Sequence, residues 1–163
     1  MDRIAATMPL SSTGDYASFL GAQFAARAAM EDAFATTSPG KLGQPPQQTQ
    51  LILADLAELG YAAPPPVSPL HLRGEAQALG AAWVVAGSSL GNRAMLAQRG
   101  KAGLGGAERF LSDPAMPAYF KRLLDVLESP ANHASIEGVI DGAHEAFALF
   151  ECAFAAQQLE NAA

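Results

Sequence analysis

The stretch "GAAWVVAGSSLGNR" (residues 80–93) is apolar and helical in character, and yet it contains three glycines. A glycine in a helix interior costs about 1 kcal/mol relative to alanine, so the bare backbone needs a reason. Residues spaced by three or four positions share one face of a helix. On that face, beside Ser88, lie Gly80, Val84, Gly87 and Gly91. The sequence therefore predicts a helix with a shallow trough along one side.

Two physical explanations for this glycine stripe remain open. Small residues allow two helix backbones to pack closely, and physics alone favours this explanation. Alternatively, the helix backbone touches a flat ligand, and the glycines both leave space for it and permit a kink. The opposite side of the helix is expected to face the core with Leu79, Trp83, Ala86 and Leu90.

Composition limits the class of protein. The chain has 163 residues, half of them hydrophobic, and a formal net charge of −6. It has no basic run, which argues against nucleic acid or an anionic membrane as a partner. It also has no apolar run near the roughly 20 residues of a membrane-spanning helix, and no signal-peptide pattern. The single cysteine, Cys152, fits a reducing cytoplasm and is expected to be a small buried apolar residue.

Helical periodicity runs through the rest of the chain, and no segment shows the alternation of a strand. Ser12 and Asp15 form a capping box before a helix over about 15–35, with an apolar stripe of Tyr16, Phe19, Leu20, Phe24 and Ala28. A second helix, over 48–59, ends at Gly60 in a left-handed cap. Its inward positions are expected to be Leu51, Leu53, Ala54, Leu56 and Leu59.

A third helix is expected from about Leu72 to Arg99, followed by a helical turn near 107–112 and a helix over 117–127. Ser129 and Pro130 are a typical N-cap and first helical residue, so the last helix is expected to run from there to Leu159. Its inward positions are expected to be Ile136, Ile140, Phe147, Phe150 and Phe154. The prediction is one all-α domain, a helical bundle spanning residues 1–163.

The segment "LGAAWVVAGSSLGNR" resembles the distal helix of bacterial heme oxygenases, especially those that make biliverdin for bacteriophytochromes. Residues that match the family's Leu-Gly-Ala-x-Tyr-Val-x-x-Gly-Ser-x-Leu-Gly-Gly pattern are Leu79, Gly80, Ala81, Val84, Gly87, Ser88, Leu90 and Gly91. "DYASFLGAQFAARAAMEDAF", "LILADLAELG", "AYFKRLLDVLE" and "AHEAFALFECAF" resemble other helices of that family in the same order. The resemblance implies a heme-oxygenase-like helical bundle whose distal glycines lie over the face of a heme.

The resemblance also implies a proximal histidine on a first helix, upstream of the Asp-Tyr-x-x-Phe-Leu element. Here "MDRIAATMPLSSTG" contains no histidine, so that helix is expected to be truncated or absent. Asn92 replaces the second glycine of the family's Gly-Gly pair, and Ala86 replaces an acid. Loss of the iron ligand should lower heme affinity and prevent oxygen activation.

The remaining candidates are contact residues rather than catalytic ones. The distal-helix pocket is expected to comprise Gly80, Val84, Gly87, Ser88, Gly91 and Asn92. Arg93 and Arg99 could pair with tetrapyrrole propionates, although solvated arginines near a helix end are the default. His144 is a possible ligand contact, whereas His71 and His133 are expected at the surface. Asp141-x-x-His144 lacks a second such motif, so no metal site is predicted.

These observations predict a degenerate, non-catalytic heme-oxygenase-like protein with a binding or regulatory (signalling) role and with no cofactor. Two alternatives stay open: an active heme oxygenase whose true start lies upstream or which uses a substitute ligand, and a heme or bilin carrier without turnover. Absence of the first helix should uncover apolar surface, so a homodimer is expected.

Overall fold

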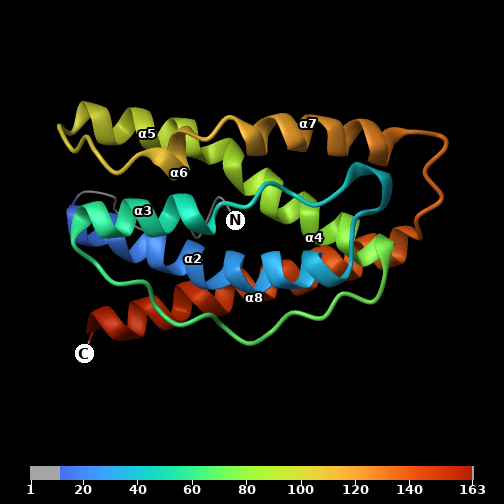
Figure 1. Ribbon diagram of the computed structural model, residues 1–163, viewed down its shortest axis with the longest axis horizontal. Helices are drawn as coiled ribbons and strands as arrows, with labels where there is room; N and C mark the ends of the chain where they lie inside the picture. The colour runs from blue at the N-terminus through green and yellow to red at the C-terminus, as the bar shows by residue number, and fades with distance from the viewer. Residues whose placement is uncertain (1–11, 163) are drawn as a thin grey trace.

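The computed structural model of the chain describes residues 12–162, with the side chains of 12–159. All regular structure in this range is helical, as predicted from composition and periodicity, and the described part of the chain contains no strand. Helices α2, α3, α4 and α8 pack together, while α5, α6 and α7 form a further layer, in which α6 contacts α3 and α7 contacts α4 (Figure 1). Within the described range, no helix is both long and apolar enough to cross a membrane. Segment 1–11, on which the prediction of a missing first helix depends, lies outside the described residues.

Helix α2 (Thr13–Thr36) begins at the predicted capping box. The Asp15 backbone N–H donates to Ser12 Oγ at 3.0 Å, and the Ser12 hydroxyl donates to the Asp15 carboxylate at 2.8 Å. Alanines are frequent along the helix, and their small side chains let neighbouring helices approach on several sides. Of its predicted stripe, Tyr16, Phe19 and Leu20 are buried, whereas Phe24 and Ala28 are only partly so.

Helix α3 (Thr49–Leu59) ends at Gly60, whose φ of +80° confirms the predicted left-handed cap. The helix start is held from α2, because the Glu31 carboxylate accepts the backbone N–H groups of Gln48 and Thr49 at 2.7 and 3.1 Å. The predicted inward face was wrong in part. Leu56 is buried, but Ala54 is exposed and Ile52 is buried in its place. The helix is therefore rotated relative to the prediction.

The single helix predicted over 72–99 is wrong, because the helical segment starts later than predicted and is then interrupted by a turn. Helix α4 (Glu75–Gly87) begins only after Gly74, whose φ of +121° is unsuited to a helix. A 3₁₀ turn, η2 (Ser88–Gly91), then separates α4 from α5 (Asn92–Lys101). The hydroxyls of Ser88 and Ser89 donate to the carbonyls three residues earlier, at 2.7 and 2.6 Å, which favours the tighter turn.

The second half of the chain comprises α6 (Arg109–Ser112), α7 (Ala115–Glu128) and α8 (Ile136–Ala162). The prediction that Ser129 and Pro130 start the last helix was wrong, because Ser129 is the C-cap of α7. A turn follows, closed by the Asn132 N–H donating to the Ser129 carbonyl at 2.9 Å. Helix α8 therefore begins about one and a half turns later than predicted.

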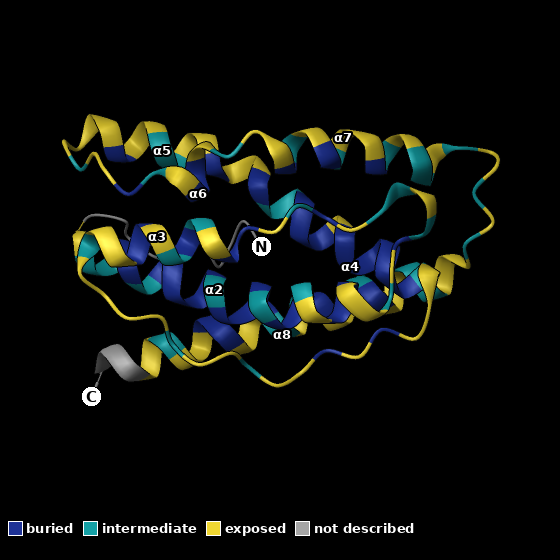
Figure 2. Ribbon diagram, viewed as in Figure 1, coloured by how far each residue is buried: buried dark blue, intermediate teal, exposed yellow. Residues whose placement is uncertain are grey.

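Helix α4 is the most buried element of the bundle (Figure 2). It packs most extensively against α8, and glycines make the contact possible from both sides. A Cβ on Gly80 would overlap the Val139 carbonyl and lie 2.8 Å from the Ala143 nitrogen. A Cβ on Gly142 would lie 2.6 Å from Gln77 Cα. Close packing therefore explains Gly80, the first glycine of the stripe.

Several side chains predicted for the core lie at the surface instead. Trp83 is 40 % and Leu90 64 % exposed, although both were expected on the inward side of α4. At the start of α8, Ile136 and Ile140 are 74 % and 49 % exposed. The prediction failed because Gly80 and Gly142 turn the glycine face of α4 toward α8, which directs Trp83 outward.

We predict that Gly80→Ala destabilises the fold, because the added methyl group meets the α8 backbone, which cannot move as a side chain can. The expected loss in free energy of unfolding is about 2 kcal/mol or more. Denaturant unfolding followed by circular dichroism measures it.

Gly91→Ala is the matched control, because a Cβ there has only Met95 Cε within reach, at 4.0 Å. We expect this variant to change the free energy of unfolding by no more than about 1 kcal/mol, in the stabilising direction. Equal stability of the two variants would contradict the packing explanation for Gly80.

Candidate functional site

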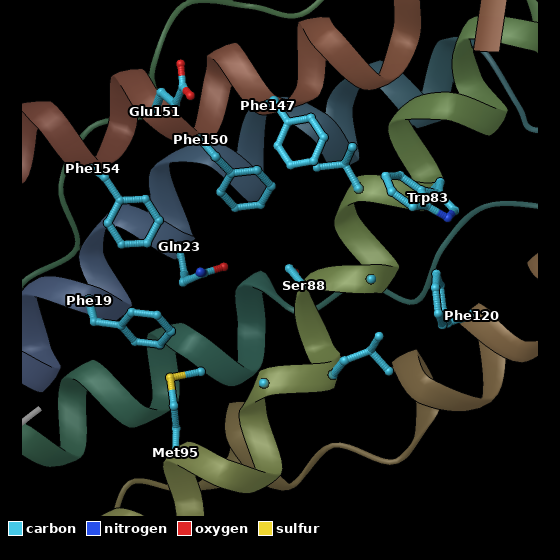
Figure 3. Close-up of a pocket in the computed structure, with 14 residues that line it drawn as sticks. Phe19, Gln23, Trp83, Ser88, Met95, Phe120, Phe147, Phe150, Glu151 and Phe154 are labelled. Carbon is cyan, nitrogen blue, oxygen red and sulfur yellow. The ribbon is translucent and has the colours of Figure 1, made fainter. Parts of the chain in front are cut away.

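The best-formed cavity in the described residues has a volume of about 330 Å³ and lies between α2, the α4–η2–α5 segment, α7 and α8. This volume is at the lower end of the roughly 300–1,000 Å³ typical of small-molecule sites. Aromatic side chains from four elements line it (Figure 3). They are Phe19, Trp83, Phe120, Phe147, Phe150 and Phe154. The cavity is thus suited to a flat, apolar molecule.

One wall of the cavity is bare backbone, supplied by Gly87 and Gly91 around the η2 turn. A Cβ on Gly87 would touch only the Phe120 ring, at 3.5 Å, and one on Gly91 would be almost in open space. The helix backbone does not need these two glycines for packing, in contrast to Gly80. The glycine stripe therefore serves two purposes, close packing at one end and an open cavity wall at the other.

The polar side of the cavity is formed by Gln23 and Ser88, which point into it in Figure 3. Arg27 lies directly behind them. Its Nε donates to Gln23 Oε1 at 3.0 Å, and its Nη2 donates to Ser88 Oγ at 2.6 Å. The Ser88 hydroxyl donates to the Val85 carbonyl, so both sides of this oxygen are engaged. A buried cation is thereby connected to the cavity through two uncharged side chains.

Arg27 is only 2 % exposed, and no carboxylate among the described residues forms an ion pair with it. Its Nη1 has no hydrogen-bond partner in the described part of the chain. The guanidinium carbon lies 5.0 Å from the centroid of the Phe110 ring and 5.8 Å from that of Phe150, so aromatic faces provide part of its stabilisation. Burial lowers the pKa of the Arg27 guanidinium to about 10. It is therefore charged at neutral pH.

Only some of the residues predicted for the distal-helix pocket line the cavity. Val84, Gly87, Ser88 and Gly91 line the cavity, whereas Gly80 lies against α8. Asn92 is buried beside the cavity-lining turn, and its amide donates to the Phe110 carbonyl at 3.4 Å.

The two predicted ligand contacts outside the distal-helix pocket, Arg93 and His144, are both exposed and do not line the cavity. Arg99 was expected to be solvated, which is wrong. It is buried, with its guanidinium carbon 3.6 Å from the centroid of the Tyr16 ring. None of these three residues is therefore placed to contact a molecule in the cavity.

A histidine-ligated heme iron does not fit the residues of this cavity. The chain has three histidines, and His71, His133 and His144 are all exposed and outside it. No group of three or more His, Cys, Asp or Glu in the described residues could hold a metal ion. Cys152, expected to be buried, is exposed on α8. What the cavity offers is apolar surface with one polar corner.

Four important cavity residues were missed at the level of sequence: Gln23, Met95, Phe120 and, behind the lining, Arg27. A usable signal existed for two of them. Arg27 interrupts an alanine-rich run, and Gln23 precedes it by one helical turn on a helix that is otherwise apolar on this face. Polar side chains at such positions are buried with the rest of the face and need partners there.

Fold and cavity together define the chain as an all-α protein with an aromatic-lined pocket between its helices. Comparisons with models of known protein families, with curated proteins and with solved structures found no match. The candidate site is therefore defined here by its own geometry: an aromatic cavity, a glycine wall and a buried arginine.

We predict that Ser88→Ala lowers the free energy of unfolding by about 2 kcal/mol, because it leaves a second nitrogen of the buried Arg27 cation unpaired. The adjacent Ser89→Ala is the control. Ser89 makes only a local bond to the Ala86 carbonyl, so its loss is expected to cost less than about 1 kcal/mol. Urea unfolding of both variants tests this, and equal losses would argue against a special role for Ser88.

Proposed function

We propose that this chain is a non-catalytic, heme-oxygenase-like binding protein that holds a flat, apolar ligand in the aromatic cavity. The observation that carries the proposal is the cavity itself, which is lined both by bare backbone at Gly87 and Gly91 and by phenyl rings from α2, α7 and α8. These glycines belong to the segment that resembles the distal helix of bacterial heme oxygenases. A glycine wall admits a planar molecule close to the helix, as a wall of larger side chains would not.

A binding role fits the cavity better than turnover does. Oxygen activation on heme iron needs an axial ligand, which a neutral histidine usually supplies. All three histidines lie outside the cavity. The nearest groups with any affinity for iron are the Met95 thioether and the Glu151 carboxylate, which is directed away from the centre of the cavity in Figure 3. The proposal therefore includes no catalytic residue.

A titration of the purified protein with heme and with biliverdin tests the proposal. We expect saturable binding of at least one of them at micromolar concentration, seen as a shift of the Soret or bilin absorption band. No biliverdin should form from heme under reductant and oxygen. Alanine substitution of His71, His133 and His144 should leave binding unchanged. Product formation would instead support the active heme oxygenase, and lack of any binding would refute a tetrapyrrole ligand.

We predict that Gly91→Leu weakens tetrapyrrole binding at least about tenfold, because the new side chain occupies cavity volume. Gly100→Leu on α5 is the matched control, since a Cβ there meets nothing within 4 Å and lies outside the cavity. Absorption titrations of both variants give the dissociation constants. Equal weakening, or none, would place the ligand elsewhere.

We also propose that the chain forms a homodimer through apolar surface at the start of α8, which would suit a regulatory role. Ile136 and Ile140 lie one turn apart there and are both exposed. Ile140→Lys is expected to shift the protein to the monomer in sedimentation velocity. Leu159→Lys, at a more exposed position far along α8, should not. A wild-type protein that is monomeric at all concentrations would exclude the dimer.

A further inference from the structure

The cavity has a buried positive charge behind its polar corner, and the one carboxylate in its lining, that of Glu151, is directed away from the centre of the cavity (Figure 3). We propose that the ligand is an apolar molecule bearing a carboxylate or sulfonate, whose anionic group accepts a hydrogen bond from the Gln23 amide as the counter-charge to Arg27. This inference rests on the proposed function, because it assumes that the aromatic cavity binds a ligand. It adds the chemical class of that ligand.

The first argument is the energetic cost of an unpaired buried cation. Charged groups inside proteins are paired or hydrogen-bonded throughout, because removal from water is otherwise very unfavourable. Arg27 is 2 % exposed and Nη1 lacks a partner in the described residues. Its two hydrogen bonds go to uncharged acceptors, Gln23 and Ser88. Within the described residues, the charge of Arg27 thus has no carboxylate in direct contact.

The second argument is that the nearby carboxylates are occupied elsewhere. Glu31 and Asp113 raise the pKa of Arg27 only through their longer-range electrostatic effect. Glu31 accepts hydrogen bonds from Gln48 and Thr49 at the start of α3. Asp113 accepts from the Gln48 side chain and from the Ala115 backbone. Both acids cap helices or hold loops, so neither is available to Arg27.

The third argument is the geometry of the corner. Arg27 Nε fixes the Gln23 amide with its oxygen toward the cation, which leaves the amide NH₂ group for the cavity. An anion at this place would accept from that NH₂ group, within the positive field of the guanidinium. The rest of the lining is aromatic and aliphatic, apart from the outward-directed Glu151, which suits an apolar ring system. One anionic group and a flat apolar body are therefore the features that the cavity selects.

Two fluorescent probes that differ only in an anionic group test this inference. They are 8-anilinonaphthalene-1-sulfonate and its uncharged counterpart N-phenyl-1-naphthylamine. Trp83 lies at the cavity, and because it is the only tryptophan of the chain, energy transfer from it reports binding at this place. Weaker binding of both probes by the Gly91→Leu variant gives a second check that they occupy the cavity. We expect the wild-type protein to bind the sulfonate roughly tenfold more tightly or better, as for a charge-assisted hydrogen bond.

Arg27→Met should reduce the ratio of the two dissociation constants to near one, with binding of the uncharged probe unchanged. Arg93→Met, which removes an exposed arginine outside the cavity, should keep the wild-type ratio. Equal binding of both probes by the wild-type protein would overturn the inference alone, as would a preference that survives Arg27→Met. If neither probe binds, the proposed function itself fails.

Gln23→Glu decides the question even if Arg27→Met does not fold. The substituted side chain is nearly the same shape and provides a carboxylate 3.0 Å from Arg27 Nε, the present distance to Gln23 Oε1. We expect a higher melting temperature and loss or reversal of the preference for the sulfonate, since the cation is then paired internally. An unchanged preference in this variant would overturn the inference.

Discussion

The backbone contact between α4 and α8 determines how the rest of the bundle is arranged. Gly80 faces the Val139 carbonyl, and Gly142 faces the Gln77 backbone. A side chain at either position would separate the helices and would expose α4, which is otherwise buried on almost all sides. The contact also fixes the rotation of α4, and this rotation directs Trp83 outward and brings Gly87 to the cavity. Fold and candidate site thus depend on the same pair of glycines.

The cavity exists because this close approach is confined to one end of the two helices. Along α8, small residues such as Gly142 are followed by Phe147, Phe150 and Phe154, whose rings hold the neighbouring elements apart. On the other side, η2 changes the direction of the chain between α4 and α5. Rings on one side and bare backbone on the other leave a space bounded by apolar atoms, with Arg27 at its polar corner.

Features that depend on neighbouring residues could be predicted from the sequence. The Ser12 cap, the Gly60 cap and the all-helical class are of this kind, because their causes lie within a few positions. Features that depend on distant contacts could not. The break at 88–91 involves a hydrogen bond between Ser88 and Arg27, which are 61 positions apart. The outward position of Trp83 follows from glycines on two different helices. Half of the stripe, Gly87 and Gly91, was placed at a pocket from its spacing and its resemblance alone, and these two glycines line the cavity that the structure contains.

The close fit of Gly80 and Gly142 against the opposite helix also limits how far the cavity walls can move. Each helix presents a notch into which the backbone of the other fits, so neither helix can slide along the other without collision. The cavity walls that α4 and α8 contribute are therefore held at a fixed distance from each other. Helix α5 packs against α6, and its Arg99 lies against the Tyr16 ring of α2, so the opposite wall is also held by contacts outside the cavity. The width of the cavity is then set on both sides by packing that a bound ligand does not touch.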